Sequence, residues 1–175
     1  VNTLTLTDGN LILKDSDFEV NAINGGSANS FVLTSGDGRL VQTFNIPRLF
    51  PIGPADGIYC PATIQQFGGQ LKFGVRVTNV FDVPTNGADR VENQWTIDTL
   101  SAGTPNVGVT LQWNSPSDEG GSFDANNCHI SYFDPATFNW IESVDAAATC
   151  NAGVCTRVQT GFNFFENAVF GVASG

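Results

Sequence analysis

Residues 91–114, VENQWTIDTLSAGTPNVGVTLQWN, decide the fold class of this chain. The first arm, residues 91–98, and the second arm, residues 107–114, both alternate apolar with polar side chains. Such a period of two is typical of strands that bury one face. The residues between the arms are of the types that favour turns. The stretch therefore predicts two strands joined as a hairpin, with Trp95 and Trp113 on buried apolar faces rather than on a surface.

The composition of the whole chain agrees with a β-rich protein. Its 175 residues include 14 phenylalanines, and 19 glycines and 8 prolines supply the turn formers that many short strands require. A chain of this length can bury a sizeable core as one domain. We therefore expect a single all-β domain over residues 1–175, an antiparallel β-sandwich of the jelly-roll or immunoglobulin-like kind.

The N-terminal residues 1–45 have a different character. Short segments rich in threonine and leucine alternate with Asp-Gly and Gly-Asp-Gly turns, and aromatic residues are few. This pattern predicts a β-meander or solenoid-like coils that extend the domain and pack on its core or on a neighbouring subunit. The stretch 2–20 is the candidate assembly strand, because such a strand can complete a neighbour's sheet. Its apolar residues are Leu4, Leu6, Leu11 and Leu13.

The charge of the chain excludes some classes of partner. Seven Lys and Arg residues against 17 Asp and Glu residues give a net charge of −10. Such a charge repels phosphate backbones and anionic membranes, so we expect no nucleic-acid partner. No apolar run approaches the length that crosses a bilayer, and the chain starts without methionine or a signal-like apolar segment. We expect no membrane insertion, and either a processed mature protein or a segment of a larger one.

The four cysteines favour disulfides over a metal site or a catalytic thiol, because their number is even and the chain has secreted features. Cys150 and Cys155 enclose a short loop that a disulfide could close as a tight hairpin. By elimination Cys60 would pair with Cys128, although four cysteines allow other connectivities. A zinc site is the competing interpretation, but the usual Cys-x-x-Cys pairs are missing and His129 is the only histidine.

Several segments carry a resemblance to a known family. They are LFPIGPADGIYCPATI, VENQWTIDTLSAGTPNVGVTLQWN and NCHISYFDPATFNW, followed by FENAVFGVAS near the C-terminus. In this order they resemble a β-rich module of large secreted surface proteins of Bacteroidetes, which are typically exported by the type IX secretion system. The resemblance covers nearly the whole chain. It implies an extracellular, cell-surface location and a structural role in adhesion or assembly, and it carries no catalytic residues.

The residues themselves give little basis for catalysis. A nucleophile needs a base held against it, but Cys128 and His129 are adjacent, and neighbours on a strand point to opposite faces. We expect His129 to be an ordinary surface or edge residue. The acidic residues fall in separate loops, where carboxylates are usually solvated, rather than in a facing pair of the glycosidase type. We therefore expect a protein that is not an enzyme.

Calcium is the main ligand candidate, and no other cofactor is expected. The loop after Trp113 contains Asp118, Glu119 and Asp124, hard oxygen ligands of the type that weak extracellular calcium sites use. Trp140 follows a turn and is the tryptophan that we expect to be exposed. Thr99, within Asp-Thr-Leu, matches a short O-glycan acceptor pattern of Bacteroidetes secreted proteins.

The sequence is compatible with two functions. The first is a structural subunit or module of a cell-surface filament or adhesin that self-assembles as a homopolymer through β-strand contacts, including donor-strand exchange. The second is a carbohydrate-binding module that recognises a surface glycan through Trp140 and the loop at residues 118–124.

Overall fold

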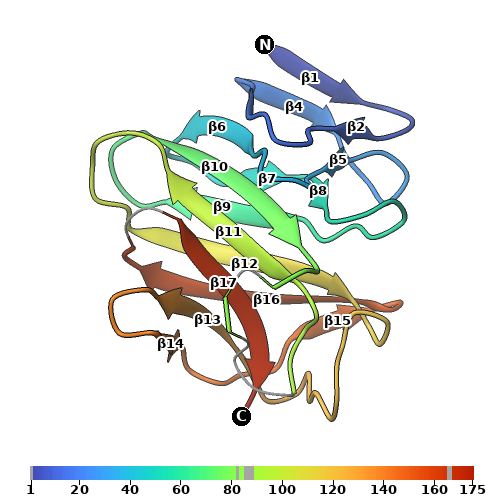
Figure 1. Cartoon of the computed structure of the whole chain (residues 1–175), viewed down its shortest axis with the longest axis vertical. Helices are drawn as coiled ribbons and strands as arrows, with labels where there is room; N and C mark the ends of the chain where they lie inside the picture. Colours follow the sequence, from blue (N-terminus) through green and yellow to red (C-terminus); the bar gives the residue numbers. More distant parts are fainter. Residues whose placement is uncertain (1, 82, 85–88, 165–166) are drawn as a thin grey trace.

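The computed structural model describes residues 2–81, 83–84, 89–164 and 167–175. Within these residues the chain forms strands, turns and loops and no helix, which confirms the all-β prediction. Several sheets pack together in a sandwich-like arrangement (Figure 1).

Two sheets make up most of the molecule (Figure 1). The larger, in spatial order, contains β14 (Asn139–Glu142), β13 (Cys128–Asp134), β17 (Ala168–Ser174), β11 (Gln94–Thr99), β10 (Leu71–Thr78), β6 (Leu40–Phe44) and β3 (Phe18–Glu19). The second contains β15 (Thr149–Asn151), β16 (Val154–Phe162), β12 (Val107–Asn114), β9 (Ala62–Gln66) and β7 (Arg48–Phe50).

Two small sheets lie at the N-terminal end of the molecule (Figure 1). One pairs β1 (Thr3–Leu6) with β4 (Ala22–Gly25), and the other joins β2 (Leu11–Ile12), β5 (Val32–Leu33) and β8 (Ile52–Gly53). Their ladders are parallel, as is the pairing of β3 with β6. A meander pairs consecutive strands antiparallel, so the meander interpretation of this region is wrong.

The hairpin predicted at residues 91–114 is also wrong, although both of its strands exist. β11 pairs with β10 and β17, whereas β12 pairs with β9 and β16, so the two arms lie in different sheets. Trp95 and Trp113 are both fully buried in one core cluster, which confirms that they are core residues. Each arm has one strongly apolar face, and placing the arms in opposite sheets buries both faces in a shared core.

The outer face of β11 is buried as well. Gln94, Thr96 and Asp98 are only 2%, 4% and 5% exposed, although their alternation predicts a solvated face. Part of the cover is polar, because Asp98 forms an ion pair with Arg39 and accepts a hydrogen bond from the backbone N–H of Asn167. A strand in the middle of a sheet can therefore be covered on both sides while keeping an alternating pattern.

Glycine allows the N-terminal ladders to approach one another closely. Gly25 has φ +83°, and a Cβ placed on it would lie 2.1 Å from the carbonyl oxygen of Leu6 on the paired strand. Any side chain at this position would therefore force β4 away from β1.

We predict that Gly25→Ala destabilises the chain by about 3 kcal/mol, because it adds a backbone clash to the cost of a positive φ. Chemical denaturation followed by circular dichroism measures this loss. Gly9→Ala is the matched control, since Gly9 has φ +73° and open space around its Cβ position, so its cost should be about 1 kcal/mol. Equal losses in the two variants would contradict the close approach.

Candidate functional site

The N-terminal stretch packs on its own chain in this structure. Leu6 and Leu13 are 7% and 8% exposed and belong to the main core cluster, while Leu4 and Leu11 are half-buried against it. The four predicted assembly leucines therefore have intramolecular partners. What the stretch leaves open is its backbone edge, because β1 pairs with β4 alone among the described strands.

Arg39 ties this stretch to the sandwich. Its Nη2 lies 2.8 Å from Asp17 Oδ2, and its Nη1 pairs with Asp98 on β11. The side-chain hydrogen bond from Arg39 is the main reason that the pKa of Asp17 is lowered. The same bond to Asp17 raises the pKa of the Arg39 guanidinium. One arginine thus holds an N-terminal turn against the covered face of the central strand.

A second open edge belongs to β14. β14 pairs only with β13 among the described strands, and Figure 1 shows it on the flank of the lower part of the molecule, far from β1 at the top. The N–H of Ser143 donates to Ile130 O on β13, so the N–H of Glu142, one residue earlier, points away from β13. On β1, Asn2 O accepts from Ala22, so the backbone groups of Thr3 and Thr5 point away from β4.

The predicted calcium ligands each have a different partner. Asp118 is 8% exposed, and its Oδ2 accepts hydrogen bonds from the backbone and side chain of Asn114 at 2.9 and 2.8 Å. Glu119 Oε1 accepts from Trp113 Nε1 at 2.8 Å, and Asp124 Oδ1 accepts from the N–H of Asn126. The part of the chain that the structure describes contains no group of three His, Cys, Asp or Glu residues suited to a metal ion.

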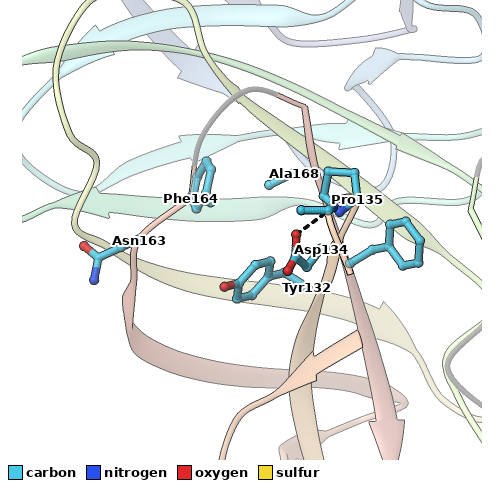
Figure 2. Close-up of a pocket in the computed structure, with 8 residues that line it drawn as sticks. Tyr132, Asp134, Pro135, Asn163, Phe164 and Ala168 are labelled. Atoms are coloured by element: carbon cyan, nitrogen blue, oxygen red, sulfur yellow. Dashed lines mark hydrogen bonds between the residues drawn. The ribbon is translucent and has the colours of Figure 1, made fainter. Parts of the chain in front are cut away.

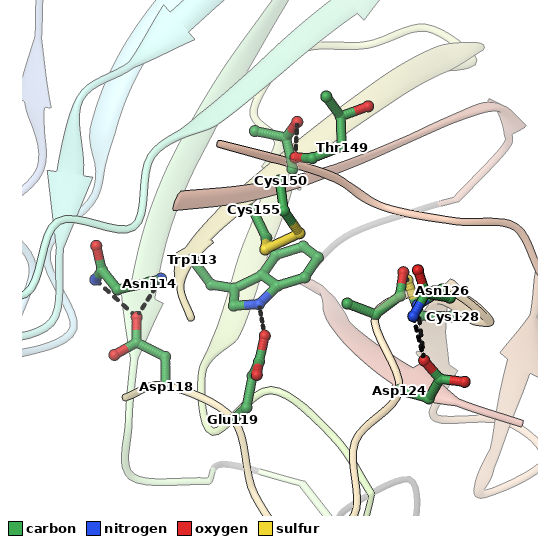
Figure 3. The surroundings of a disulfide bond; sticks show 12 residues. Trp113, Asn114, Asp118, Glu119, Asp124, Asn126, Cys128, Thr149, Cys150 and Cys155 are labelled. Carbon is green, nitrogen blue, oxygen red and sulfur yellow. Dashed lines mark hydrogen bonds between the residues drawn. A yellow bond between two sulfur atoms is a disulfide. The ribbon is translucent and has the colours of Figure 1, made fainter. Parts of the chain in front are cut away.

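The disulfide between Cys150 and Cys155 confirms the predicted local pair (Figure 3). It joins β15 to β16 at directly opposed positions. Cys155 also lies opposite Trp113 on β12, and Figure 3 shows the bridge beside the indole ring. The disulfide therefore covers one side of a core tryptophan.

The predicted pair of Cys60 with Cys128 is wrong, because both are free, buried thiols. Cys60 Sγ donates to Asp118 Oδ2 at 3.3 Å, whereas Cys128 Sγ lies beside the carbonyl oxygen of Ala125. Burial raises the pKa of both thiols, and the neighbouring Asp118 carboxylate adds to the effect at Cys60. Thiols held in the neutral form are poor nucleophiles. Elimination failed here because buried cysteine also serves as a small apolar side chain.

His129 is buried rather than at the surface, which corrects the prediction for this residue. It is 4% exposed, its Nδ1 lies 2.8 Å from Asp145 Oδ1, and its Nε2 lies 3.9 Å from Glu142 Oε1. The segment after β14 folds back over β13 and places Asp145 beside His129. No local sequence pattern predicts this contact, because the two residues are 16 positions apart. His129 therefore has a carboxylate partner, while the thiol of Cys128 faces main-chain carbonyls.

Two further predicted positions have other roles. Trp140 is half-buried, with its Nε1 donating to Pro84 O at 2.8 Å and its ring against Phe133. The hydroxyl oxygen of Thr99 is buried at the end of β11. A glycan could be attached to Thr99 only before the strand folds, so the structure does not support Thr99 as a surface acceptor.

Sequence reasoning missed Arg157, which bridges the two large sheets. This residue of β16 is 7% exposed, and it donates from Nε to Cys128 O at 3.1 Å and from Nη2 to Val144 O at 2.8 Å. The only local signal is a single cation inside an otherwise neutral strand, VCTRVQTGF. Arg157 closes one part of the sandwich edge between β13 and β16.

No family model, no curated protein and no solved structure matches the chain. Among the residues that the structure describes, no helix is long and apolar enough to cross a membrane. The resemblance to a Bacteroidetes surface module stays a prediction. The function therefore has to be inferred from the residues and their geometry.

The ion pair of Asp17 predicts a pH dependence of stability. A carboxyl group whose pKa is lowered by folding stabilises the fold above its unfolded pKa, and the stabilisation disappears as the pH falls through the folded pKa. Asp17→Asn should therefore cost at most about 1 kcal/mol at pH 7, since the pair is partly exposed, and nothing well below its unfolded value of 3.8. Urea denaturation at a series of pH values measures the difference.

Asp8→Asn is the matched control for this experiment, because Asp8 is exposed and has no ion pair among the described residues. It should change stability little at any pH. A difference between Asp17→Asn and wild type that does not shrink in acid would contradict the role of the Arg39 pair.

The thiol state of the chain is directly testable. Titration with a thiol reagent should find no rapidly reacting group in the native, unreduced protein. After unfolding without reductant it should find two thiols, which peptide mapping assigns to Cys60 and Cys128. Absence of thiols in the unfolded chain would mean that these two cysteines are paired.

Proposed function

We propose that the protein is a non-enzymatic structural subunit or module of an extracellular filament or adhesin, and that it assembles head to tail through strand edges. One observation carries this proposal: β1 and β14 are each open on one side, and they lie far apart, with β1 at the top and β14 on the flank of the lower part of the molecule (Figure 1). A backbone edge of this kind is a template for pairing with another chain.

Pairing β1 of one subunit with β14 of the next is a heterologous contact. Such a contact leaves one free edge at each end of the pair, so further copies can add in the same way and produce an open filament. The outward backbone groups of Thr3 and Thr5 on β1, and the outward N–H of Glu142 on β14, would supply the hydrogen bonds. Main-chain pairing of this type needs no large apolar patch at either edge.

We favour edge addition over exchange of the whole N-terminal strand. β1 is paired with β4 along its length, and Leu6 is buried in the core of its own chain. The parallel pairings of β1 with β4 and of β2 with β5 support reading this region as solenoid-like coils, to which a further strand can be added. The edge can thus be used without unfolding the extension.

The extracellular part of the proposal rests on composition and chemistry. A disulfide persists in an oxidising compartment, and the bond between Cys150 and Cys155 is of this kind. The net charge of −10 is compatible with a solvated surface protein. Both features agree with the resemblance to secreted surface modules.

Proline at the two edges tests the proposal. Thr5→Pro and Glu142→Pro each remove an outward N–H while keeping the bonds to β4 and β13, so each should abolish filaments seen by electron microscopy. Thr5→Ala and Glu142→Ala keep the N–H and serve as matched controls that should still assemble.

These point variants are sharper than deletion of residues 1–20, because that deletion also removes core residues such as Leu6 and Leu13. Circular dichroism establishes that each proline variant is folded. Filaments formed equally well by folded Thr5→Pro and Glu142→Pro would overturn assembly through these edges.

A further inference from the structure

A groove runs along the sandwich edge between β13 and β14 on one side and β16 on the other. It consists of two adjoining pockets, of about 350 and about 450 Å³, which share Tyr132 and Asn163 as lining residues, and Figure 2 shows the first of them. Volumes of this size are typical of small-molecule sites. None of the predicted ligand residues of the acidic loop or Trp140 lines either pocket.

The groove exists because the sandwich is closed on only part of this edge. Arg157 bridges the sheets, and β15 pairs with the first residues of β16 alone. Beyond these contacts β16 has an irregularity opposite Val107 and Val109, with Gly161 at φ +87°. Bulges of this kind redirect a strand and re-aim the residues that follow. Here the redirected residue is Asn163, on the groove.

Tyr132 forms a rigid aromatic element at the centre of the groove. Its ring packs edge-on against Phe162, with 6.1 Å between centroids, and lies 6.0 Å from the ring of Phe170. Figure 2 shows its hydroxyl directed to the side on which Asn163 lies. The ring is therefore fixed by the core, while its polar end reaches the groove.

Several polar groups along the groove are not used by the fold. The Tyr132 hydroxyl and the exposed Asn163 amide have no hydrogen-bond partner within the described residues. The hydroxyl oxygen of Ser143, a residue beside the second pocket, also lacks a partner in the described part of the chain, but it is buried and is therefore not available to a ligand. The Tyr132 hydroxyl and the Asn163 amide are the groups available to hydrogen-bond a ligand.

The charges on the rim restrict the class of ligand. Asp134 and Glu142 line the groove, and among the residues that the structure describes no lysine or arginine lines either pocket. Asp134 is occupied by the turn, where it accepts from Ala136 N at 2.9 Å and from Thr137 Oγ1 at 2.8 Å. An anionic polymer would be repelled by these carboxylates.

We propose that this groove binds a neutral oligosaccharide. A pyranose ring presents an apolar C–H face, which can lie on the half-buried ring of Tyr132, and a rim of hydroxyls, which pair well with an amide that both donates and accepts. Asn163 and the Tyr132 hydroxyl recognise the sugar where the pockets meet, and the second pocket holds the next unit. The proposal does not rest on assembly through the β1 and β14 edges, although Ile141 and Glu142 of β14 line the second pocket.

The test uses the whole chain and defined polysaccharides. Affinity electrophoresis and calorimetry are run with mixed-linkage β-glucan, xyloglucan, galactomannan and starch, and with polygalacturonate as the anionic probe. At least one neutral polymer should bind. Asn163→Ala and Tyr132→Phe should each weaken that binding about tenfold, as expected for the loss of one or two hydrogen bonds to the sugar.

Asn29→Ala is the matched control, because Asn29 is also exposed but lies in the N-terminal region, and it should leave binding unchanged. Asn163 is at the surface, so its variant should fold even if Tyr132→Phe does not. Three results would overturn the proposal: no binding of any neutral polymer, equal binding by Asn163→Ala and wild type, or a preference for polygalacturonate. If no neutral polymer binds and Asn163→Ala loses self-association, the groove binds a second copy of the chain rather than a sugar.

Discussion

The burial of two indole rings in one core is the constraint on which the rest of the structure depends. A buried indole N–H needs an acceptor. Trp95 finds it in the carbonyl oxygen of Cys60, and Trp113 finds it in the carboxylate of Glu119. These two bonds anchor the segments that precede β9 and follow β12, far from each other in the sequence.

The same constraint explains the fate of the acidic loop. Glu119 is bound to Trp113, and the neighbouring Asp118 is buried. Asn114 and the Cys60 thiol donate hydrogen bonds to the Asp118 carboxylate. A buried carboxylate must be hydrogen-bonded, and here Ser117 Oγ also donates to Asp118, so its three partner residues are all neutral. Residues that look like metal ligands in the sequence are thus used to hold the loop under the tryptophans.

The side chains at the centre of the molecule are buried in the core. The groups that a partner or ligand could reach therefore lie at the edges of the sheets. β1 and β14 each have one open side, and the side edge carries a groove in which the Tyr132 hydroxyl and the Asn163 amide lack protein partners among the described residues. Arg157 separates the closed part of that side edge from the open part. β14 contributes to both features, because its backbone edge is open and its residues Ile141 and Glu142 line the groove.

Local pattern was sufficient for the strands themselves. The alternation in residues 91–98 and 107–114 predicts two strands, which the structure contains as β11 and β12, and the spacing of Cys150 and Cys155 predicts their disulfide. These features depend on residues close together in the sequence. Period-two alternation and the spacing of two cysteines around a short loop can be recognised in the sequence without knowledge of the tertiary contacts.

Only the tertiary structure decided which strands pair and which polar residues are covered. Residues 91–114 are compatible with a hairpin or with a crossing between sheets, and the need to bury both tryptophan faces selects the crossing. The burial of His129 and the separation of Cys60 from Cys128 follow from segments distant in sequence that fold over them. The sequence by itself determined the strands and their apolar faces, while long-range packing determined their partners, because alternation specifies a face but not what lies against it.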